Sequence, residues 1–149
     1  MEGTAPMSVT TTPAIDSAPL TREAGTRLVE GWTALWNGDV ALAEQILAPG
    51  FRLHFADDFD GTGSAYSFGQ EELTAFISAN SLALTGLTFA AESAPLVDTE
   101  RGEMACRWTE SHADGDGEVA VKSGIDMFAV TDGRISAVWS LTGNRRFAA

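Results

Sequence analysis

The chain has 149 residues, of which 44% are hydrophobic and 20% are charged, a composition typical of a globular protein with one domain. Its 21 acidic residues against 9 lysines and arginines give a formal net charge of −12, which excludes nucleic acid and anionic membrane surfaces as favoured partners. The single cysteine, Cys106, excludes an internal disulfide and is typical of a reducing compartment, so we expect a cytoplasmic protein. No apolar stretch approaches the length of a transmembrane helix.

The N-terminal segment differs in composition from the rest of the chain. It is rich in Thr, Ser, Pro and Ala and holds few large apolar groups able to offset the entropy lost on ordering. We therefore expect residues 1–20 to form a disordered tail and residues 21–149 to form a single domain.

Two helices are predicted at the start of this domain. Thr21 is a candidate N-cap, and Asn37-Gly38 ends the first helix. Asp39 can cap a second helix, which Ala48-Pro49-Gly50 stops. Apolar residues recur at helical spacing in both segments: Leu28, Trp32, Leu35 and Trp36 in the first, and Leu42, Ile46 and Leu47 in the second.

A short strand, a polar loop and a third helix follow. Apolar and polar residues alternate in FRLHFA, residues 51–56, which predicts a half-buried strand. The polar loop of residues 57–66 contains Tyr66, the only tyrosine and a candidate lid residue. Ser67 with Gln70 three residues later is a capping box for the third helix, whose apolar face comprises Leu73, Phe76 and Ile77.

From Thr85 onward the pattern changes from helix to strand. Turn signals at residues 99–102, 114–117 and 132–133 divide this part into four long strands joined as an antiparallel meander. Helices segregated from such a sheet indicate an α+β fold. We expect a curved, mostly antiparallel sheet that wraps around the first helix and leaves a pocket at its open end.

The strand within residues 124–131 is apolar on both faces and yet contains an acid. Because side chains alternate along a strand, Asp126 shares one face with Phe128 and Val130. Helices can cover only one face of the sheet, so we expect the second face to be buried in a homodimer. This second face is predicted to carry Ile125, Met127, Ala129 and, from the next strand, Val138.

Several stretches resemble the nuclear transport factor 2-like superfamily. LVEGWTALWNGDVALAEQILAPGFRLHF is similar to its paired opening helices and first strand, and FGQEELTAFI to its third helix. CRWTESHADG and GIDMFAVTDGRISAVW resemble later strands of its SnoaL-like polyketide cyclase branch. The resemblance spans residues 21 to 142 or so and implies a cone-shaped α+β barrel. It implies less about function, because this scaffold hosts isomerases, cyclases, hydrolases, binding modules and non-catalytic subunits.

The resemblance implies a catalytic role for Asp126. In SnoaL-like cyclases an aspartate at this place points into the cone and acts as the acid/base of an aldol ring closure that needs no cofactor. A carboxyl group desolvated by Phe128, Val130 and nearby Trp side chains has its pKa raised towards neutrality, where it can accept or donate a proton. The alternative is a structural aspartate that accepts hydrogen bonds from backbone amides or from Arg107.

Two histidines are further candidates for proton transfer. His112 lies where the relatives often have Gly-Thr-His, and this chain has Glu110-Ser111-His112. His54 stands on the short strand, where a polar residue of the relatives often borders the pocket. The alternatives are a rim histidine beside the turn at Asp114 and a surface histidine on a half-exposed strand.

Aromatic and cationic residues are candidates for ligand binding. Trp32 and Trp36 lie one helical turn apart and either form the floor of the pocket or fill the core, and the same alternatives hold for Trp108 and Trp139. Arg107 stands among apolar residues and needs a partner, either the buried aspartate or a ligand oxygen. The complete set of substrate-binding candidates is Trp32, Trp36, Arg107, Trp108, Phe128, Trp139 and Tyr66.

Other chemistries of this scaffold fit the sequence less well. Steroid isomerases of this fold use a tyrosine on the first helix, where this chain has tryptophan, and epoxide hydrolases use Arg-x-Asp, where Arg107 is followed by Thr109. The histidines and the cysteine lack metal-ligand spacing and no glycine-rich phosphate loop occurs, so we expect no metal and no cofactor. Two functions remain: a cofactor-free cyclase or isomerase for a hydrophobic, oxygenated, polyketide-like small molecule, or a non-catalytic binding or accessory dimer.

Overall fold

A computed structural model of the chain describes residues 19–56 and 66–148. The predicted tail up to residue 18 and the predicted loop over residues 57–65 lie outside the described residues. The helical elements are α2 (Arg22–Trp36), the 3₁₀ helix η2 (Val40–Leu42), α3 (Ala43–Ile46) and α4 (Gln70–Ala83). The strands are β1 (Leu47–Phe55), β2 (Tyr66–Phe68), β3 (Thr88–Ala91), β4 (Leu96–Asp98), β5 (Glu103–Ala113), β6 (Val119–Thr131) and β7 (Arg134–Thr142).

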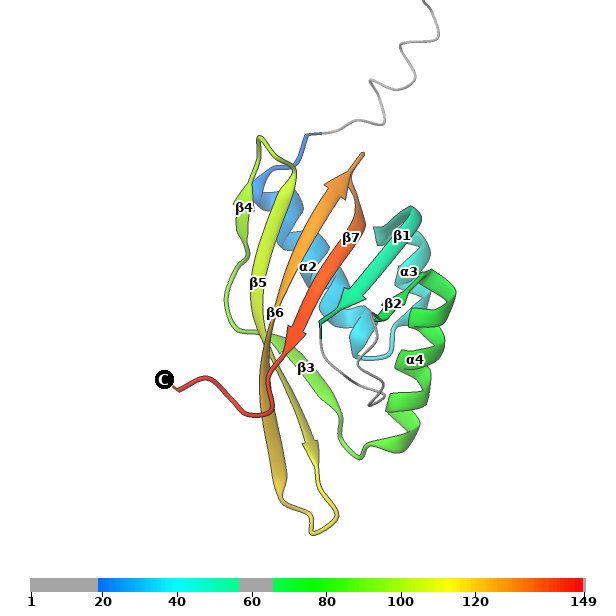
Figure 1. The fold of residues 1–149 in the computed structure, drawn as a ribbon, viewed down its shortest axis with the longest axis vertical. Helices are drawn as coiled ribbons and strands as arrows, with labels where there is room; N and C mark the ends of the chain where they lie inside the picture. Colours follow the sequence, from blue (N-terminus) through cyan, green and yellow to red (C-terminus); the bar gives the residue numbers. More distant parts are fainter. Residues whose placement is uncertain (1–18, 57–65, 149) are drawn as a thin grey trace, which may run out of the picture.

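The strands form one curved sheet that wraps around α2 (Figure 1). Their order is β2-β1-β7-β6-β5-β3, and β4 also pairs with β5. Only β1 and β7 run parallel; the other neighbours are antiparallel. The predicted α+β class with a curved, mostly antiparallel sheet is therefore confirmed, and α4 lies beside the β2 edge (Figure 1).

Helix α2 forms as its sequence predicts. The Thr21 Oγ1 atom accepts a hydrogen bond of 3.0 Å from the backbone N–H of Ala24. The helix ends at Trp36, with Asn37 as its C-cap before Gly38, whose φ is 112°. The buried face of α2 packs against the sheet. Leu20, which the sequence assigns to the tail, is also buried in this core.

The second predicted helix is shorter than expected. The Asp39 side chain makes no capping hydrogen bond, and α3 ends at Ile46. Leu47, predicted to lie on the helix, is the first residue of β1 and pairs with Ile135. Residues 48–50 therefore do not stop a helix but lie within an irregular part of β1, where the long-range pairing with β7 overrides the local helical pattern.

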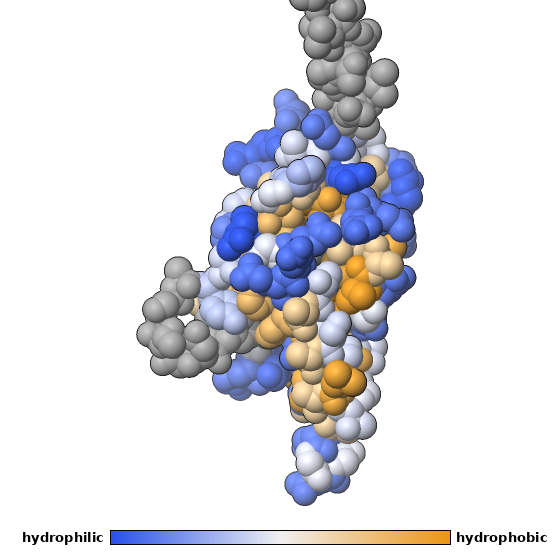
Figure 2. All heavy atoms as spheres, turned by 90° about the vertical axis from the view of Figure 1, so that its right-hand side faces the viewer, coloured by the Kyte–Doolittle hydropathy of each residue, from blue (hydrophilic) through white to orange (hydrophobic). Residues whose placement is uncertain are grey.

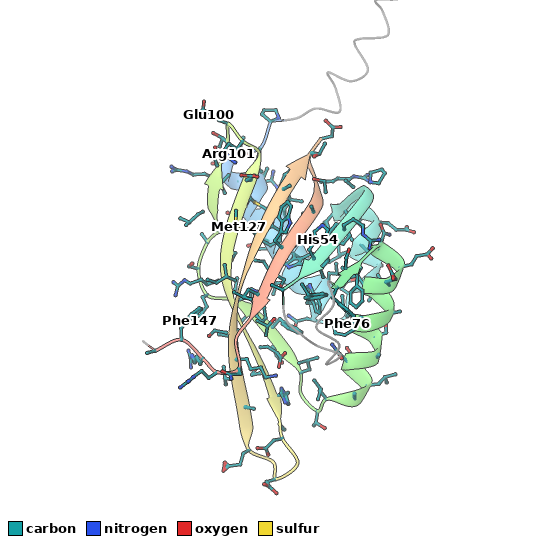
Figure 3. The ribbon with its side chains drawn as sticks, viewed as in Figure 1. His54, Phe76, Glu100, Arg101, Met127 and Phe147 are labelled. Carbon is teal, nitrogen blue, oxygen red and sulfur yellow. The ribbon has the colours of Figure 1, made fainter. Side chains whose placement is uncertain are left out.

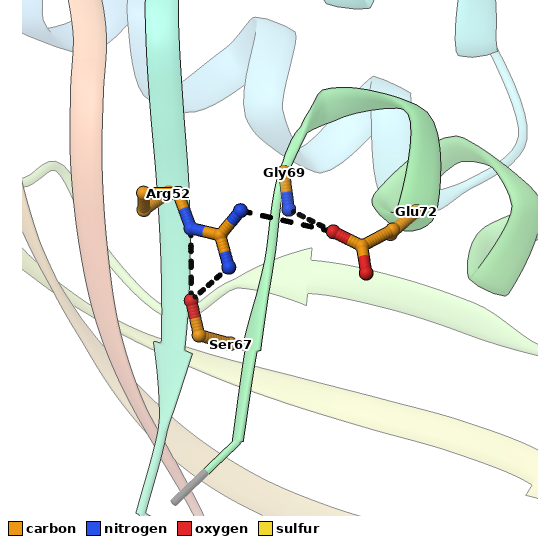
Figure 4. A network of polar contacts seen from close by, with 4 residues as sticks. All are labelled: Arg52, Ser67, Gly69 and Glu72. Carbon is orange, nitrogen blue, oxygen red and sulfur yellow. Dashed lines mark hydrogen bonds and ion pairs between the residues drawn. The ribbon is translucent and has the colours of Figure 1, made fainter.

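The predicted capping box of the third helix is wrong. Its N-cap is Gly69, and the Glu72 carboxylate accepts a hydrogen bond of 2.8 Å from the backbone N–H of Gly69. Ser67 belongs to β2, where its hydroxyl accepts hydrogen bonds of 3.0 and 2.7 Å from the Arg52 guanidinium (Figure 4). Arg52 also lies 3.8 Å from Glu72, so strand pairing places Ser67 in a network that links β1, β2 and α4.

The first of the four predicted long strands is interrupted, so that the meander contains β3 and β4 in its place. Both pair with β5, with Ala91 opposite Trp108 and Leu96 opposite Ala105. The four residues between Ala91 and Leu96 therefore face only two residues of β5. One of these four is Pro95, which has no N–H to donate to the ladder. The three predicted turns are confirmed and contain glycines with positive φ: Gly102, Gly117 and Gly133.

The convex face of the sheet exposes apolar side chains, as predicted for Ile125 and Met127. Val138 was expected beside them, but this prediction is wrong because the Val138 side chain is fully buried. It lies opposite Phe128 in the β6–β7 ladder, and residues directly opposite one another share a face. Trp139 and Leu141 occupy the exposed positions of β7 instead.

The remaining surface is mixed in character. Figure 2 looks onto the side that carries α4 and the projecting β5–β6 hairpin, where apolar areas alternate with charged ones. Leu82 on α4 and Val119 on the hairpin are exposed large apolar residues. None of the helices in the described part of the chain is both long and apolar enough to cross a membrane.

Candidate active site

A cavity of about 130 Å³ lies between α2, α4 and the concave face of the sheet. Seven of its described lining residues are aromatic: Trp32, Trp36, Phe55, Phe76, Phe89, Trp108 and Phe128. Its wall is therefore suited to a flat, unsaturated ligand.

Regular spacing on three elements brings the lining residues together. Trp32 and Trp36 lie one turn apart on α2, and their rings meet edge to face at 5.9 Å. Every second residue of β5 and of β6 points to the concave face. These strands supply Cys106, Trp108 and Glu110 from β5, and Lys122, Asp126 and Phe128 from β6.

Asp126 is buried in this wall, with 4% of its surface exposed. Its Oδ2 atom accepts a hydrogen bond of 3.0 Å from the indole N–H of Trp32. The Trp32 ring also packs edge to face against Phe128 at 5.7 Å. The contact joins α2 to β6 and fixes the carboxyl group against an aromatic surface.

Cys106 lies opposite Asp126 in the β5–β6 ladder and also lines the cavity. Burial raises the pKa of the Cys106 thiol, and the Asp126 charge raises it further, while Arg107 opposes both. The thiol is accordingly kept protonated and is a poor nucleophile. Cys106 is therefore a poor candidate for nucleophilic chemistry at neutral pH.

Trp108 lies flat across β6. A Cβ atom at Gly124, its partner in the ladder, would overlap the Trp108 indole. The glycine therefore creates the space in which the indole lies against the sheet and lines the cavity. The buried indole N–H of Trp108 has no hydrogen-bond partner among the described residues.

Polar residues gather further along β5 and β6. The His112 Nδ1 atom lies 3.1 Å from the Glu110 carboxylate, and the two side chains are about equally buried, with 16% and 15% exposed. Glu110 lines the cavity, whereas His112, two residues further along β5, is not among the described lining residues. Lys122 stands opposite Glu110 in the ladder and lines the cavity as well.

Five of the predicted site residues are not among the described residues that line the cavity: His112, His54, Trp139, Arg107 and Tyr66. His54 stacks on Trp139 with ring centroids 5.8 Å apart, and Trp139 is exposed on the convex face (Figure 3 labels His54). Arg107 is exposed opposite Ile125, so it does not hold the Asp126 carboxylate. Tyr66 lies in β2 rather than in the expected loop, and its ring contacts Phe68 at 5.0 Å.

The structure brings the other predicted residues together. Trp32, Trp36, Trp108, Phe128 and Asp126 all line the cavity. Phe76, predicted only as part of a helix face, lies between α4 and the sheet at the cavity (Figure 3). Sequence reasoning missed further lining residues: Phe55, Asn80, Phe89, Cys106, Glu110, Lys122, Ser140 and Thr142.

One signal in the sequence identifies some of the missed residues. Cys106 and Glu110 lie two residues to either side of Trp108, and Lys122 lies four residues before Asp126, so strand alternation puts them on the faces already assigned to the pocket. Residues contributed by α4 and β3 carry no such signal. Within residues 19–56 and 66–148, no three His, Cys, Asp or Glu side chains are arranged to hold a metal ion.

No protein-family model and no curated protein matches the chain. Solved structures do: TsrD from Streptomyces laurentii is 20% identical with a TM-score of 0.65, covering 83% of this chain and 90% of that one. IdmH from Streptomyces antibioticus, whose assignment as a polyketide cyclase is itself a proposal, is 16% identical with a TM-score of 0.66 and coverages of 80% and 92%.

A third similar structure, from Jannaschia sp. CCS1, has been proposed to be a SnoaL-like polyketide cyclase. It is 20% identical with a TM-score of 0.58, covering 79% of this chain and 86% of that one. The chain therefore has the nuclear transport factor 2-like fold found in SnoaL-like proteins, as its sequence resemblance implied. At these identities the likeness establishes the fold, and the activity has to be argued from the site.

Proposed function

We propose that this chain, which has the fold of SnoaL-like proteins, is a cofactor-free cyclase or isomerase acting on a hydrophobic, oxygenated, polyketide-like molecule. One observation carries the proposal: a buried carboxyl group, Asp126, lies in the wall of an aromatic cavity and is oriented by the indole N–H of Trp32. A positioned acid/base in an aromatic cavity is what carbon–carbon bond formation by enolate chemistry requires.

The proposed reaction needs one group that accepts and then returns a proton. The Asp126 carboxylate removes a proton from a carbon beside a carbonyl, and the electrons of that C–H bond form an enolate. The enolate carbon attacks a second carbonyl carbon of the same molecule, which forms the ring bond and moves the carbonyl π electrons onto oxygen. That oxygen takes the proton from Asp126, so the carboxylate is regenerated and no oxidant or reductant is consumed. Return of the proton to a different carbon would instead give isomerisation.

Two features of the structure act on the Asp126 carboxyl group in opposite directions. Burial among Trp32, Phe128 and the other aromatic rings disfavours the charge, whereas the hydrogen bond donated by Trp32 stabilises it. The proposed cycle requires this carboxyl group to accept one proton and to return it. Similar structures that include proposed polyketide cyclases support the same substrate class.

The proposal can be tested with a partial reaction that does not require the natural substrate. The protein should accelerate deuterium incorporation from D₂O into the α-carbon of 2-tetralone, a flat ketone of suitable size, as followed by NMR. Asp126→Asn should lower this rate by roughly 10²–10⁴-fold, because the amide has nearly the same size but cannot accept the proton. Glu30→Gln, at an exposed position of α2, is the matched control and should retain the rate.

Outcomes of this experiment distinguish catalysis from a structural role. If Asp126→Asn unfolds at lower temperature and exchange in the wild type equals the buffer rate, the carboxylate is a structural anchor. If the variant is stable and exchanges as fast as wild type, Asp126 is not the base, and His112 is the next residue to substitute. His54 follows as a lower priority because it stacks on the convex face.

A non-catalytic binding or accessory role is the second candidate function. The hydrogen bond between Trp32 and Asp126 favours it, because this contact satisfies a buried carboxylate and links α2 to the sheet without any chemistry. Such a protein would bind ketones and alcohols of the same shape equally well and would catalyse no exchange.

A further inference from the structure

We propose that Lys122 is the anion-binding residue of the cavity, and that the ligand is an aromatic or polyene acid whose carboxylate lies at the Lys122 end. The inference rests on the proposed role of the cavity as a ligand site and narrows its substrate class. It concerns recognition rather than proton transfer, so binding measurements test it independently of catalysis.

Lys122 is the only lysine of the chain and is placed in the cavity wall. It belongs to β6 and shares the concave face with Asp126, four residues further on. Among the described residues that line the cavity it is the only cation. All eight arginines are therefore absent from the described wall of a protein whose net charge is −12.

No described acidic side chain forms an ion pair with this ammonium group. Glu110 is opposite Lys122 in the β5–β6 ladder and is the obvious partner, but its carboxylate lies 3.1 Å from the His112 imidazole instead. Within residues 19–56 and 66–148 no ion pair involves Lys122. A lysine in the wall of an aromatic cavity that forms no ion pair with a described acid is available to a ligand anion.

The positions of the two charged groups set the polarity of the ligand. Four residues along a strand correspond to about 13 Å between the Lys122 and Asp126 backbones. Because Lys122 is the only described cation of the wall and the Glu110 carboxylate opposite it lies against His112, a carboxylate should lie at the Lys122 end, with its rings extending over Trp36 and Trp108 towards Asp126. A protein of net charge −12 otherwise repels anions, so local compensation by one cation is needed for an acid to enter.

A matched pair of probes separates charge from shape. We expect the wild-type protein to bind 2-naphthoate roughly tenfold more tightly than 2-naphthamide at neutral pH and low salt, measured by calorimetry. Lys122→Gln should abolish this preference, while Lys122→Arg should keep most of it. Arg27→Gln is the control, because it removes one positive charge at an exposed position of α2 outside the cavity wall and should leave the preference unchanged.

A second measurement uses the wild-type sequence and so does not depend on a variant that folds. Reductive methylation with ¹³C-formaldehyde labels one lysine, Lys122, and the α-amino group, which is distinguished by its lower pKa. The lysine methyl resonance should shift on addition of 2-naphthoate, and much less on addition of 2-naphthamide.

The possible results test the role of Lys122 separately from the existence of a ligand site in the cavity. Equal affinity for acid and amide in the wild type, or a preference that survives in Lys122→Gln, would overturn the role of Lys122 while leaving the cavity as a ligand site. Failure of both probes to bind at millimolar concentration would overturn the ligand site itself, and the role of Lys122 with it.

Discussion

Asp126 and its neighbours show how the same residues serve stability and chemistry. The Trp32 indole fills the core with its ring and donates its N–H to the Asp126 carboxylate, so one side chain both packs and orients. Cys106, opposite Asp126 in the ladder, is held as a protonated thiol by burial and by the adjacent charge.

The state of Cys106 gives a prediction about pH. A thiol whose pKa is raised in the folded protein contributes stability that is fully present below its unfolded-state pKa and is lost as the pH rises through the folded-state pKa. Stability should therefore fall in the alkaline range above the ordinary thiol pKa, and Cys106→Ala should show a smaller fall, as measured by urea unfolding at several pH values. Native Cys106 should also resist iodoacetamide at pH 8 in mass spectrometry; rapid alkylation would contradict the assignment.

At the scale of elements, β5 and β6 build the site as a pair. Their ladder extends from Glu103 opposite Ala129 to Ala113 opposite Val119, the longest pairing in the sheet. Alternation along this ladder gives one face to the cavity and the other to the convex surface. Gly124 interrupts the series of side chains on the cavity face at the point where the Trp108 indole crosses β6.

Substitution of Gly124 tests this arrangement. A methyl group at Gly124 must displace the indole of Trp108, so Gly124→Ala should destabilise the protein by roughly 1–3 kcal/mol and change its near-ultraviolet circular dichroism. Gly115→Ala, in a turn where an added Cβ meets nothing within 4 Å, is the control and should have little effect. A second substitution, Trp108→Leu, should recover part of the stability lost in Gly124→Ala.

The junction of the N-terminal segment with α2 gives a second prediction at this scale. Leu20 packs in the core beside Gly25, whereas the composition of the preceding residues predicts a dispensable tail. Removal of residues 1–18 should leave the melting temperature within a degree or two. Leu20→Ala in the full chain should cost about 2 kcal/mol, because it opens a cavity in the core. A large loss of stability on removal of residues 1–18 would show that they pack onto the domain.

At the scale of the whole molecule, the two faces of the sheet have different surroundings. The concave face is covered by helices and contains the cavity. The convex face exposes large apolar side chains: Ile125, Met127, Trp139 and Leu141. His54 stacks on Trp139 there, and Figure 3 shows Met127 on the same sheet.

This face supports the prediction of a homodimer through the sheet. We expect a dimer in sedimentation experiments at micromolar concentration, because burial of the exposed apolar side chains is favourable. Met127→Asp should give a monomer, since it places a carboxylate in the interface, while Leu82→Asp on α4 should not. Added salt should tighten the dimer by screening the repulsion between two chains of net charge −12. A wild-type monomer under these conditions would contradict the prediction.

The sequence by itself determined the features that depend on short-range periodicity. These are α2 with its Thr21 cap, the three turns of the meander, the α+β class and the assignment of Asp126 to the same face as Phe128. It failed where long-range pairing competes with a local signal, as at Leu47, Ser67 and Val138. In each case a ladder partner, which no local pattern identifies, decided the conformation or the face.

Only the tertiary structure decided which candidate residues meet. Strand alternation placed Asp126 on one face, but it could not show that Trp32, 94 residues away along the chain, donates a hydrogen bond to it. Nor could it separate Trp108 in the cavity from Trp139 on the convex face, because that depends on which side of the curved sheet α2 covers. The physical reason is that periodicity fixes relative faces within an element, whereas contacts between elements depend on how the whole sheet curves around the helix.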